Sequence, residues 1–375
     1  MSEPVPPVRT RGRAITVALV AVVVLAAVAS GVFEWLQSEF RTPGPSTNTV
    51  RLQVEPRASV RTVLNDLGRL QVVRHPRAIE WYLRLHRRSP RIQTGMYEIP
   101  PASSPAQVLE LFEQGRVVLE QLTVIEGSTF ADLRRELDQH AAITHTSRGK
   151  TDAEVMAALG HPGEFPEGRF FPDTYRFAAR TTDLEILSLA YASMARVLAA
   201  AWQERSEGLP IQTPYEALTL ASVIEKETGL PAERPRIAGV FVSRLKLGMR
   251  LQSDPTVIYG LGARYDGDIR TRDLVTDTAY NTYTRSGLPP TPIASPGRES
   301  IFAAVHPLDT GELYFVATAG GDGGHHFSKT LEEHNAAVKA YLQRLRAQQR
   351  TVASHRTVGS PSPGTSHHTG SAEGK

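Results

Sequence analysis

The sequence predicts an α+β protein with a single N-terminal transmembrane helix, a small α+β module and a larger mixed α+β domain. Three observations predict this class. Residues 14–33 contain no charge, residues 42–49 are rich in proline, glycine, serine and threonine, and short strand-like and helix-like patterns alternate from residue 50 onward. We divide the chain into a cytoplasmic N-terminus (1–13), a transmembrane helix (14–33), a linker (34–49), a small module (50–116), a large domain (117–346) and a disordered tail (347–375).

The apolar segment at residues 14–33 is long enough to cross a bilayer, because twenty helical residues rise about 30 Å. Three arginines within residues 9–13 precede it, so the positive-inside rule keeps the N-terminus in the cytoplasm. The alternative is a cleaved signal peptide, since residues 27–29 (AVA) resemble a cleavage site. Signal h-regions usually run about 7–15 residues, which favours a retained anchor. We expect a single-pass protein of the inner (plasma) membrane whose domains are periplasmic or extracytoplasmic.

The composition excludes several classes of site. The chain has no cysteine, which excludes disulfides, thiolate metal sites and a cysteine nucleophile. Its net charge of +3 over 375 residues is too small to indicate a polyanion as partner. The densest basic run, residues 84–91 (RLHRRSPR), fits a solvated helix end better than a nucleic-acid site in an exported domain. No nucleic-acid partner is expected.

The small module combines short strands with short helices. Alternation at residues 50–54 predicts a half-buried strand, and Ser59 is suited to cap a helix over residues 60–70. Further elements are expected at residues 78–85 (helix), 97–99 (strand) and 105–114 (helix). The strand–helix opening is similar to LysM-like modules, a resemblance that implies glycan binding.

The large domain is expected to begin with a strand at residues 121–125 and a helix that Thr129 and Asp132 cap. Helical periodicity returns at residues 183–201, 214–228, 234–247 and 331–345, and residues 313–317 form a strand candidate. Residues 286–298 hold four prolines and two glycines and are interpreted as the rim of a cleft. Gly320 to Gly324 (GGDGG) is interpreted as a hairpin turn.

The helix at residues 214–228 has clear boundaries in the sequence. Thr213 is a good N-cap, Pro214 suits the first helical position and Glu216 completes a capping box. Gly229 is expected to end the helix in the left-handed conformation.

Two glutamates near the end of this helix point in different directions. Glu227 extends an apolar stripe through residues 220, 223 and 224, whereas Glu225 points about 200° away. A carboxyl group beside apolar residues has a raised pKa and suits general-acid chemistry. The alternative is that Glu227 simply reaches solvent from the last turn, and this helix alone does not decide between the two.

The segment ASVIEKET (residues 221–228) resembles the active-site helix of the YceG-like family, the endolytic murein transglycosylases. Further segments resemble family motifs in the same order: IEGSTFADL, EGRFFPDTYRF, ERPRIAGVFVSRLKLGMRLQSDPTVIYGLG, AYNTYTRSGLPPTPIASPG, AAVHP and LYFVATAGGDGGHHFSKTLEEHN. Together they cover about residues 119–345. Matches this long and collinear are highly specific.

The resemblance implies a lytic transglycosylase, a carbon–oxygen lyase that cleaves the β-1,4 bond between N-acetylmuramic acid and N-acetylglucosamine in nascent peptidoglycan strands. It implies 1,6-anhydromuramic acid ends, an end to strand elongation, no cofactor, and peptidoglycan synthases as partners. The second glutamate of the family's E-K-E triplet is the catalytic acid and maps onto Glu227. That residue would protonate the glycosidic oxygen and then take the proton of the muramoyl 6-hydroxyl.

Seven further residues with hydroxyl, amide, carboxylate or aromatic groups are expected to bind the substrate: Glu225, Asp254, Thr256, Tyr259, Asn281, Tyr283 and His326. For Asp254, an Asx-turn into Pro255 is an equally good interpretation. For Asn281 and Tyr283 the groove is favoured over a structural role.

Four histidines invite a zinc hypothesis: His306, His325, His326 and His334. None has the H-E-x-x-H spacing of a metalloprotease, so no metal site is expected.

Two other functions compete with the transglycosylase. A non-catalytic peptidoglycan-binding scaffold would use the same module and cleft. A pyridoxal-phosphate lyase related to aminodeoxychorismate lyase is set aside, because its cofactor chemistry belongs in the cytoplasm.

Overall fold

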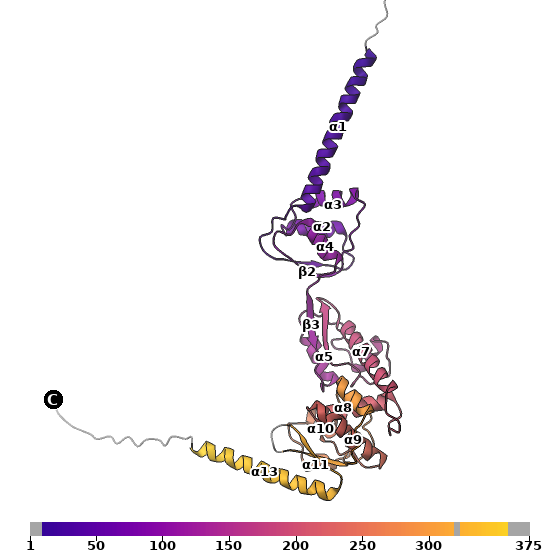
Figure 1. The fold of residues 1–375 in the computed structure, drawn as a ribbon, viewed down its shortest axis with the longest axis vertical. Coiled ribbons are helices and arrows are strands. Elements are labelled where there is room, and N and C mark those ends of the chain that lie inside the picture. Colours follow the sequence, from indigo (N-terminus) through magenta and orange to yellow (C-terminus); the bar gives the residue numbers. More distant parts are fainter. Residues whose placement is uncertain (1–9, 319–322, 359–375) are drawn as a thin grey trace, which may run out of the picture. The chain divides into compact units, whose positions relative to one another are not determined.

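The computed structural model describes residues 10–318 and 323–358, which form two compact units (Figure 1). Of these residues, the first unit comprises 10–122, 140–144 and 176–182, and the second comprises 123–139, 145–175, 183–318 and 323–358. The division falls inside the strands β3 (Leu119–Thr123) and β4 (Thr174–Ala178), which pair in a two-stranded sheet. The mixed α+β class is confirmed.

The helix α1 (Thr10–Arg41) has an exposed apolar part and a buried end. Within Ile15–Arg41 an 18-residue apolar window has a mean hydropathy of 2.7 and is not buried at all. The helix is therefore long and apolar enough to span a membrane, a property that a signal sequence shares. Leu36 and Phe40, by contrast, lie in the core of the first unit. Residues 34–41, which sequence analysis assigns to a linker, are therefore helical. The i, i+4 spacing of these two apolar side chains is what turns the helix end into a packing surface.

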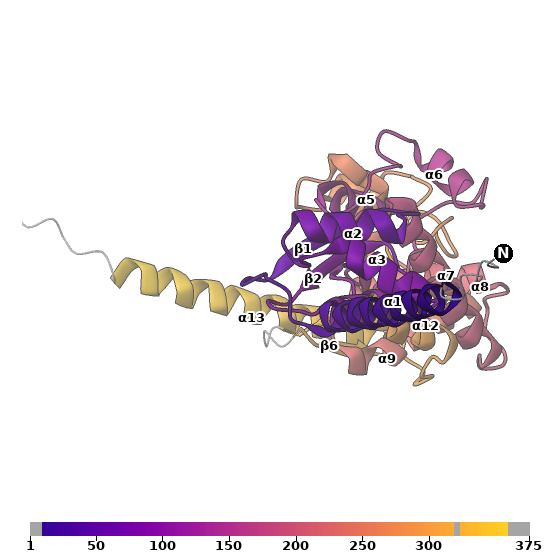
Figure 2. The same cartoon turned by 90° about the horizontal axis from the view of Figure 1, so that it is seen from above.

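The rest of the first unit contains β1 (Val50–Val54), α2 (Val60–Arg69), α3 (Pro76–Leu85), β2 (Gly95–Ile99) and α4 (Pro105–Glu113). β1 and β2 are antiparallel, with Val50 opposite Ile99. The hydroxyl of Ser59 accepts a hydrogen bond from the Thr62 N–H (3.1 Å), so the predicted cap of α2 is confirmed. α3 packs against both α1 and α2, as the view from above also shows (Figure 2).

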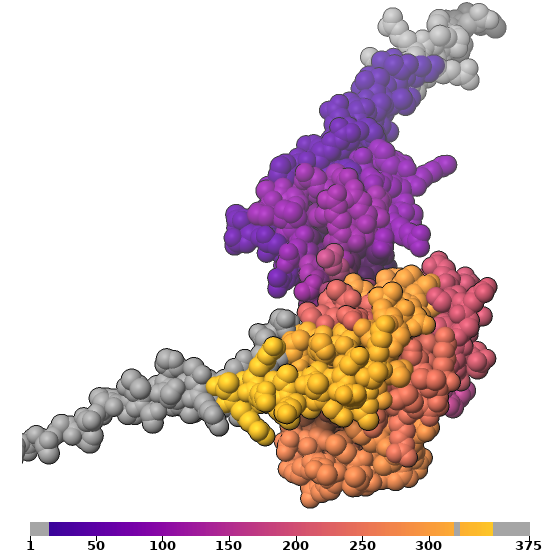
Figure 3. Space-filling view, turned by 60° about the horizontal axis from the view of Figure 1, so that its bottom comes forward, coloured from indigo at the N-terminus to yellow at the C-terminus, as the bar shows by residue number. Residues whose placement is uncertain are grey.

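The second unit is mainly helical. Its elements are α5 (Phe130–Gln139), α6 (Asp152–Ala158), α7 (Asp183–Gln203), α8 (Pro214–Glu227), η1 (Pro231–Glu233), α9 (Arg234–Lys246), α10 (Asp254–Leu261), η2 (Gly262–Arg264), α11 (Thr271–Val275), α12 (Arg298–Val305), β5 (Tyr314–Ala317), β6 (His325–Ser328) and α13 (Leu331–Val358). β5 and β6 form an antiparallel pair, and α13 packs against both strands; its yellow surface is visible in Figure 3.

The helix α8 lies at the centre of this unit. Every residue from Ala217 to Ile224 is buried, and α7, α9 and α12 pack around it. α7 is also long and apolar, but its buried side chains, such as Met194 and Val197, belong to this core. Close approach of the chain to α9 requires Gly239, because a Cβ there would lie 2.0 Å from the Leu308 carbonyl oxygen.

Two expectations from the sequence differ from the structure, and a third lies mostly outside the described residues. Residues 286–298, the expected rim of a cleft, are instead packed onto α8 over much of their length: positions 292–297 are buried, and the Ile293 N–H donates to the Ser222 hydroxyl of α8 (3.0 Å). α13 continues to Val358, so the predicted disordered tail begins too early at residue 347. Residues 348–358 contain neither proline nor glycine, so no residue in this stretch ends the helix. The predicted turn at Gly320 to Gly324 lies mostly outside the described residues.

Candidate active site

A cavity of about 470 Å³ opens in the second unit at the C-terminal end of α8. It is lined by residues of α8, α9, β5, β6, α13 and the segments before α10 and after Asn281: Glu227, Arg244, Leu251, Gln252, Asp254, Tyr283, Tyr314, Phe315, Val316, Ala317, His325, Leu331, His334 and Asn335. Hydroxyl, carboxylate, imidazole and aromatic groups thus share one hollow, the mixture that polar ligand sites use.

Local sequence fixes where α8 begins and ends. The Thr213 hydroxyl accepts from the Glu216 N–H (3.1 Å), which confirms the predicted N-cap. The reciprocal half of the capping box is wrong, because the Glu216 carboxylate accepts from the Gln212 N–H instead (2.5 Å). Gly229 has no positive φ; the chain leaves the helix through the extended backbone of Thr228 (φ −142°, ψ 136°). Glu227 is consequently the last helical residue, placed where the core ends and the cavity begins.

The carboxyl group of Glu227 is held by a short hydrogen bond in a poorly solvated position. Oε1 accepts from the Ser253 hydroxyl at 2.5 Å. Burial raises the pKa of Glu227 to about 7 and the charge of Asp254 adds to this increase, while the Ser253 hydrogen bond and the charge of Arg244 oppose it. Near neutral pH a substantial fraction of Glu227 therefore carries a proton that it can donate.

Ser253 is itself positioned by buried hydroxyls. Its N–H donates to the Thr282 hydroxyl (3.0 Å), and its carbonyl accepts from the Thr256 hydroxyl (2.7 Å). Although Ser253 is the N-cap of α10, its side chain makes no capping hydrogen bond. The hydroxyl that would normally cap the helix is thus used for Glu227.

Asp254 and Tyr283 form a second polar pair on the cavity wall. The Tyr283 hydroxyl donates to Oδ1 of Asp254 at 2.6 Å. Burial, and next this hydrogen bond, raise the pKa of Tyr283, so the phenol keeps its proton. From the sequence, Asp254 is interpreted either as a substrate-binding residue or as an Asx-turn into Pro255. In the structure its side chain lies on the wall of the cavity and accepts the hydrogen bond from Tyr283.

Five of the seven residues expected to bind the substrate lie outside the cavity lining. The Glu225 side chain is 5% exposed; its carboxylate accepts from Arg234 (3.1 Å) and from the Gly297 N–H (2.9 Å). Asn281 is buried, and its amide donates to three backbone carbonyls, at Asp273, Leu274 and Thr276. Both side chains are therefore structural ties.

Thr256 is fully buried behind Ser253, and the Tyr259 hydroxyl donates to Oε2 of Glu167 (3.1 Å). Neither lines the cavity. His326 is exposed and also lies outside the lining, whereas its neighbour His325 is part of it. Since alternate residues of a strand face opposite sides, only one histidine of the pair lines the cavity, and it is not the one predicted.

Several cavity residues were not predicted. The buried Arg244 guanidinium donates to the carbonyls of Leu313 (2.7 Å) and Leu251 (2.6 Å) and lies over the Tyr314 ring. Nδ1 of His325 lies 2.8 Å from Oε2 of Glu233, whereas the buried Nδ1 of His334 has no partner among the described residues. These residues lie on separate elements that are distant in the sequence, so no sequence motif links them. They come together only because α9, the β5–β6 pair and α13 pack around one cavity.

A second buried carboxyl group, Glu167, lies outside the cavity lining. Its Oε1 accepts from the Phe130 N–H (2.9 Å) at the start of α5, and burial raises its pKa to about 7. Its contacts join α5 to α10 through Tyr259, which indicates a structural role.

No group of three or more histidine, aspartate or glutamate side chains is placed to hold a metal ion within residues 10–318 and 323–358. His306 instead contacts backbone carbonyls, with Nε2 2.7 Å from the Glu204 oxygen.

A carboxyl group with a raised pKa, in an open polar cavity that a second carboxylate also lines, is typical of acid–base enzymes that act on glycosidic bonds.

Comparison with known proteins gives the family. The chain matches the YceG-like family over residues 52–340 and belongs to it, as the collinear motifs predict. Over 314 residues it is 30% identical to an endolytic murein transglycosylase of Bacillus subtilis strain 168, a match that covers 79% of this chain and 86% of that protein.

Two further relatives are more distant. An endolytic murein transglycosylase of Streptococcus pneumoniae serotype 2 is 24% identical over 331 residues, a match that covers 79% of this chain and 59% of that protein. A crystal structure of a putative YceG-like protein from Listeria monocytogenes is 28% identical, covers 78% of this chain and 99% of its own, and has a TM-score of 0.48.

Proposed function

We propose that this protein is a membrane-anchored endolytic lytic transglycosylase that cleaves the bond between N-acetylmuramic acid and N-acetylglucosamine in peptidoglycan. The observation that carries the proposal is Glu227, a carboxyl group with a pKa of about 7 on the wall of a polar cavity. Membership of a family whose relatives are named endolytic murein transglycosylases supports the same reaction.

The reaction needs one carboxyl group in two successive roles. Protonated Glu227 gives its proton to the glycosidic oxygen while the bond from that oxygen to the muramoyl C1 breaks. The N-acetylglucosamine side leaves with a free hydroxyl, and Glu227 becomes a carboxylate. The carboxylate then takes the proton of the muramoyl 6-hydroxyl as its oxygen bonds to C1. The product has a 1,6-anhydro ring, no water is added, and Glu227 is protonated again.

The cavity residues support this cycle through charge and shape. The Ser253 hydroxyl stabilises the carboxylate formed halfway, because a hydrogen bond to the charged form favours it. Asp254, Tyr283, Arg244 and His334 line the same hollow and are the side chains that we assign to the sugar rings and their N-acetyl groups. Glu225, Thr256, Tyr259 and Asn281 act indirectly, since each holds a neighbouring segment in place.

The first unit supplies location in this proposal. α1 anchors the chain in the inner membrane, which restricts the cavity to glycan near the bilayer, where synthases release nascent strands. The order β1, α2, α3, β2 supports the LysM-like interpretation, in which this unit also holds glycan. Under this proposal the enzyme ends growing strands.

The experiment is product analysis. The purified full chain is incubated in detergent with murein glycan strands, and the products are separated and weighed by mass spectrometry. We expect muramoyl ends lighter by one water than reducing ends, the signature of the anhydro ring. Reducing ends would show hydrolysis instead, and intact strands that remain bound would show a non-catalytic scaffold. Alkaline extraction of cell membranes tests the anchor separately, since a cleaved signal peptide would leave the chain soluble.

A further inference from the structure

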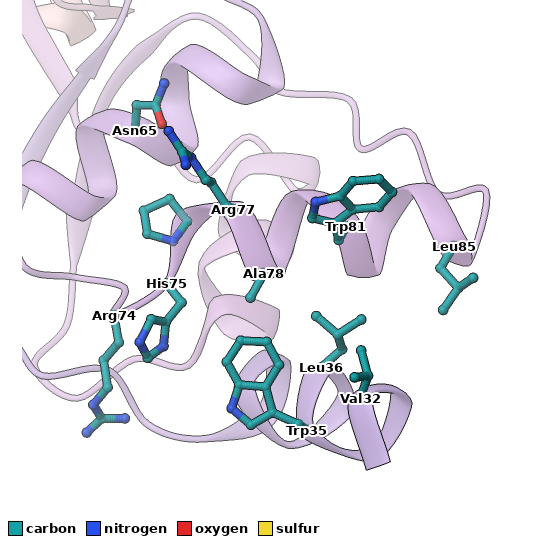
Figure 4. Close-up of a pocket in the computed structure, with 11 residues that line it drawn as sticks. Val32, Trp35, Leu36, Asn65, Arg74, His75, Arg77, Ala78, Trp81 and Leu85 are labelled. Atoms are coloured by element: carbon teal, nitrogen blue, oxygen red, sulfur yellow. The ribbon is translucent and has the colours of Figure 1, made fainter. Parts of the chain in front are cut away.

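A hollow of about 750 Å³ lies in the first unit between the end of α1 and α3, and we call it the juxtamembrane groove (Figure 4). It is lined by Val32, Trp35, Leu36, Asn65, Arg74, His75, Pro76, Arg77, Ala78, Trp81 and Leu85. None of these residues belongs to the cavity around Glu227, and the proposed reaction gives the groove no role.

One wall of the groove is apolar and faces solvent. Trp81 and Leu85 of α3 are 63% and 57% exposed, and Val32 and Trp35 of α1 are 51% and 49% exposed. In Figure 4 the two tryptophan side chains extend from separate helices that flank the hollow. Such a group of large exposed apolar side chains marks a surface that binds another molecule.

The other end of the groove is basic. Arg74, His75 and Arg77 line it, and Nδ1 of His75 lies 3.1 Å from a carboxylate oxygen of Glu39 on α1. Residues 74–91 contain six arginines and a single acid, Glu80. That acid is already paired, since it accepts from Arg61 (2.8 Å) and Arg84 (2.7 Å). The whole chain has a net charge of only +3, so positive charge is concentrated on this segment.

The place of the groove along α1 identifies its surroundings. Val32 is within the last turn of the apolar segment, and Trp35 and Leu36 follow after Glu34. If α1 spans the membrane, as proposed above, these residues lie at the boundary between hydrocarbon and headgroups. Tryptophan is enriched at that boundary, and arginine there meets lipid phosphates.

We propose that the juxtamembrane groove binds an anionic phospholipid from the leaflet out of which α1 emerges. An acyl chain lies along Val32, Leu36 and Leu85, the two indoles flank the glycerol region, and the phosphate lies at Arg74 and Arg77. Charge complementarity favours this occupant over a second copy of the chain, because a symmetric contact would bring two arginine-rich segments together. The bound lipid fixes the first unit against the bilayer surface.

The test uses the full chain in vesicles and the fluorescence of Trp81. Substitutions Trp35→Phe and Trp202→Phe leave Trp81 as the sole indole, since the chain has three tryptophans. Brominated phosphatidylglycerol or brominated phosphatidylcholine is added at one low mole fraction to otherwise identical vesicles. We expect the anionic lipid to quench Trp81 several-fold more strongly than the neutral lipid.

Two matched variants separate the groove from general charge. Arg74→Gln with Arg77→Gln should remove the anionic preference, since each basic residue near an anionic surface strengthens binding about fivefold and the two together about 25-fold. Arg51→Gln with Arg57→Gln removes the same charge from exposed positions outside the groove and should leave the preference unchanged.

Several outcomes would overturn the proposal. Equal quenching of Trp81 by both lipids would exclude selective binding. If neither lipid quenched Trp81 although α1 resisted alkaline extraction, α3 would face away from the bilayer. Cross-linked dimers formed through Trp81-face residues, with no lipid preference, would make a second copy the occupant. Release by alkali together with preferential quenching would refute the anchor but support the lipid site, so the two failures are distinguishable.

Discussion

The hydrogen bond between Ser253 and Glu227 gives a quantitative prediction. The Ser253 hydroxyl donates to Oε1 at 2.5 Å and favours the charged carboxylate, so it lowers a pKa that burial has raised to about 7. Substitution Ser253→Ala removes this donor. A hydrogen bond to a charged group contributes about 1.5–3 kcal/mol, and one pKa unit corresponds to about 1.4 kcal/mol. The pKa of Glu227 should therefore rise by about one to two units in the variant.

The assay is the pH dependence of kcat/KM, measured as the release of anhydromuramoyl ends from glycan strands. A general acid must be protonated, so activity should fall as pH rises through the pKa of Glu227. In Ser253→Ala this alkaline limb should move to higher pH while the maximum rate falls, because the carboxylate formed during the reaction loses its donor. Ser253→Thr keeps a hydroxyl and should retain the original limb. An unchanged limb, or one displaced to lower pH, would refute the assignment of Glu227 as the titrating acid.

Three predictions concern stability. The pKa of Glu167 is raised to about 7, so the folded state holds this proton more tightly than the unfolded chain, and stability is lost as pH rises from about 4.5 to 7. Glu167→Gln should therefore stabilise the protein by roughly 1–3 kcal/mol at pH 8 and little at pH 4. Equal shifts of the melting temperature at both pH values would contradict this. Arg234→Met leaves the buried Glu225 carboxylate without its cation and should cost about 3–5 kcal/mol in urea unfolding, whereas a change below about 1 kcal/mol would show that water solvates Glu225. Gly239→Ala places a Cβ against the Leu308 carbonyl oxygen and should cost about 1–3 kcal/mol, and an unchanged melting temperature would mean that the 308 segment moves away freely.

The helix that carries Glu227 was predictable because its signals are local. The cap at Thr213 and the apolar periodicity lie within fifteen residues of one another, and the structure contains both. The periodicity predicts an amphipathic helix, whereas the middle of α8 is buried on every side. Glu225 therefore reaches Arg234 and not solvent, and only the position of α9 shows this.

The remainder of the site depends on contacts between segments distant in sequence. Ser253 reads as an ordinary N-cap, and its use by Glu227 arises because α8 and the start of α10 meet. Asn281 has the polar amide expected of a sugar contact, yet a loop seven residues away folds onto it and uses its donors. The proline-rich segment at residues 286–298 is typical of a cleft rim, yet its Ile293 N–H donates to the buried Ser222 hydroxyl of α8. Residue type alone does not reveal which partner each side chain finds.

The most direct test of the central claim compares the two carboxyl groups that line the cavity. Wild type, Glu227→Gln and Asp254→Asn are each purified, checked for retained thermal stability and glycan binding, and incubated with glycan strands. If Glu227 donates the proton, Glu227→Gln should bind strands and form no anhydromuramoyl ends, while Asp254→Asn should keep measurable activity. An active Glu227→Gln variant beside an inactive Asp254→Asn variant would contradict the account and transfer the acid to Asp254.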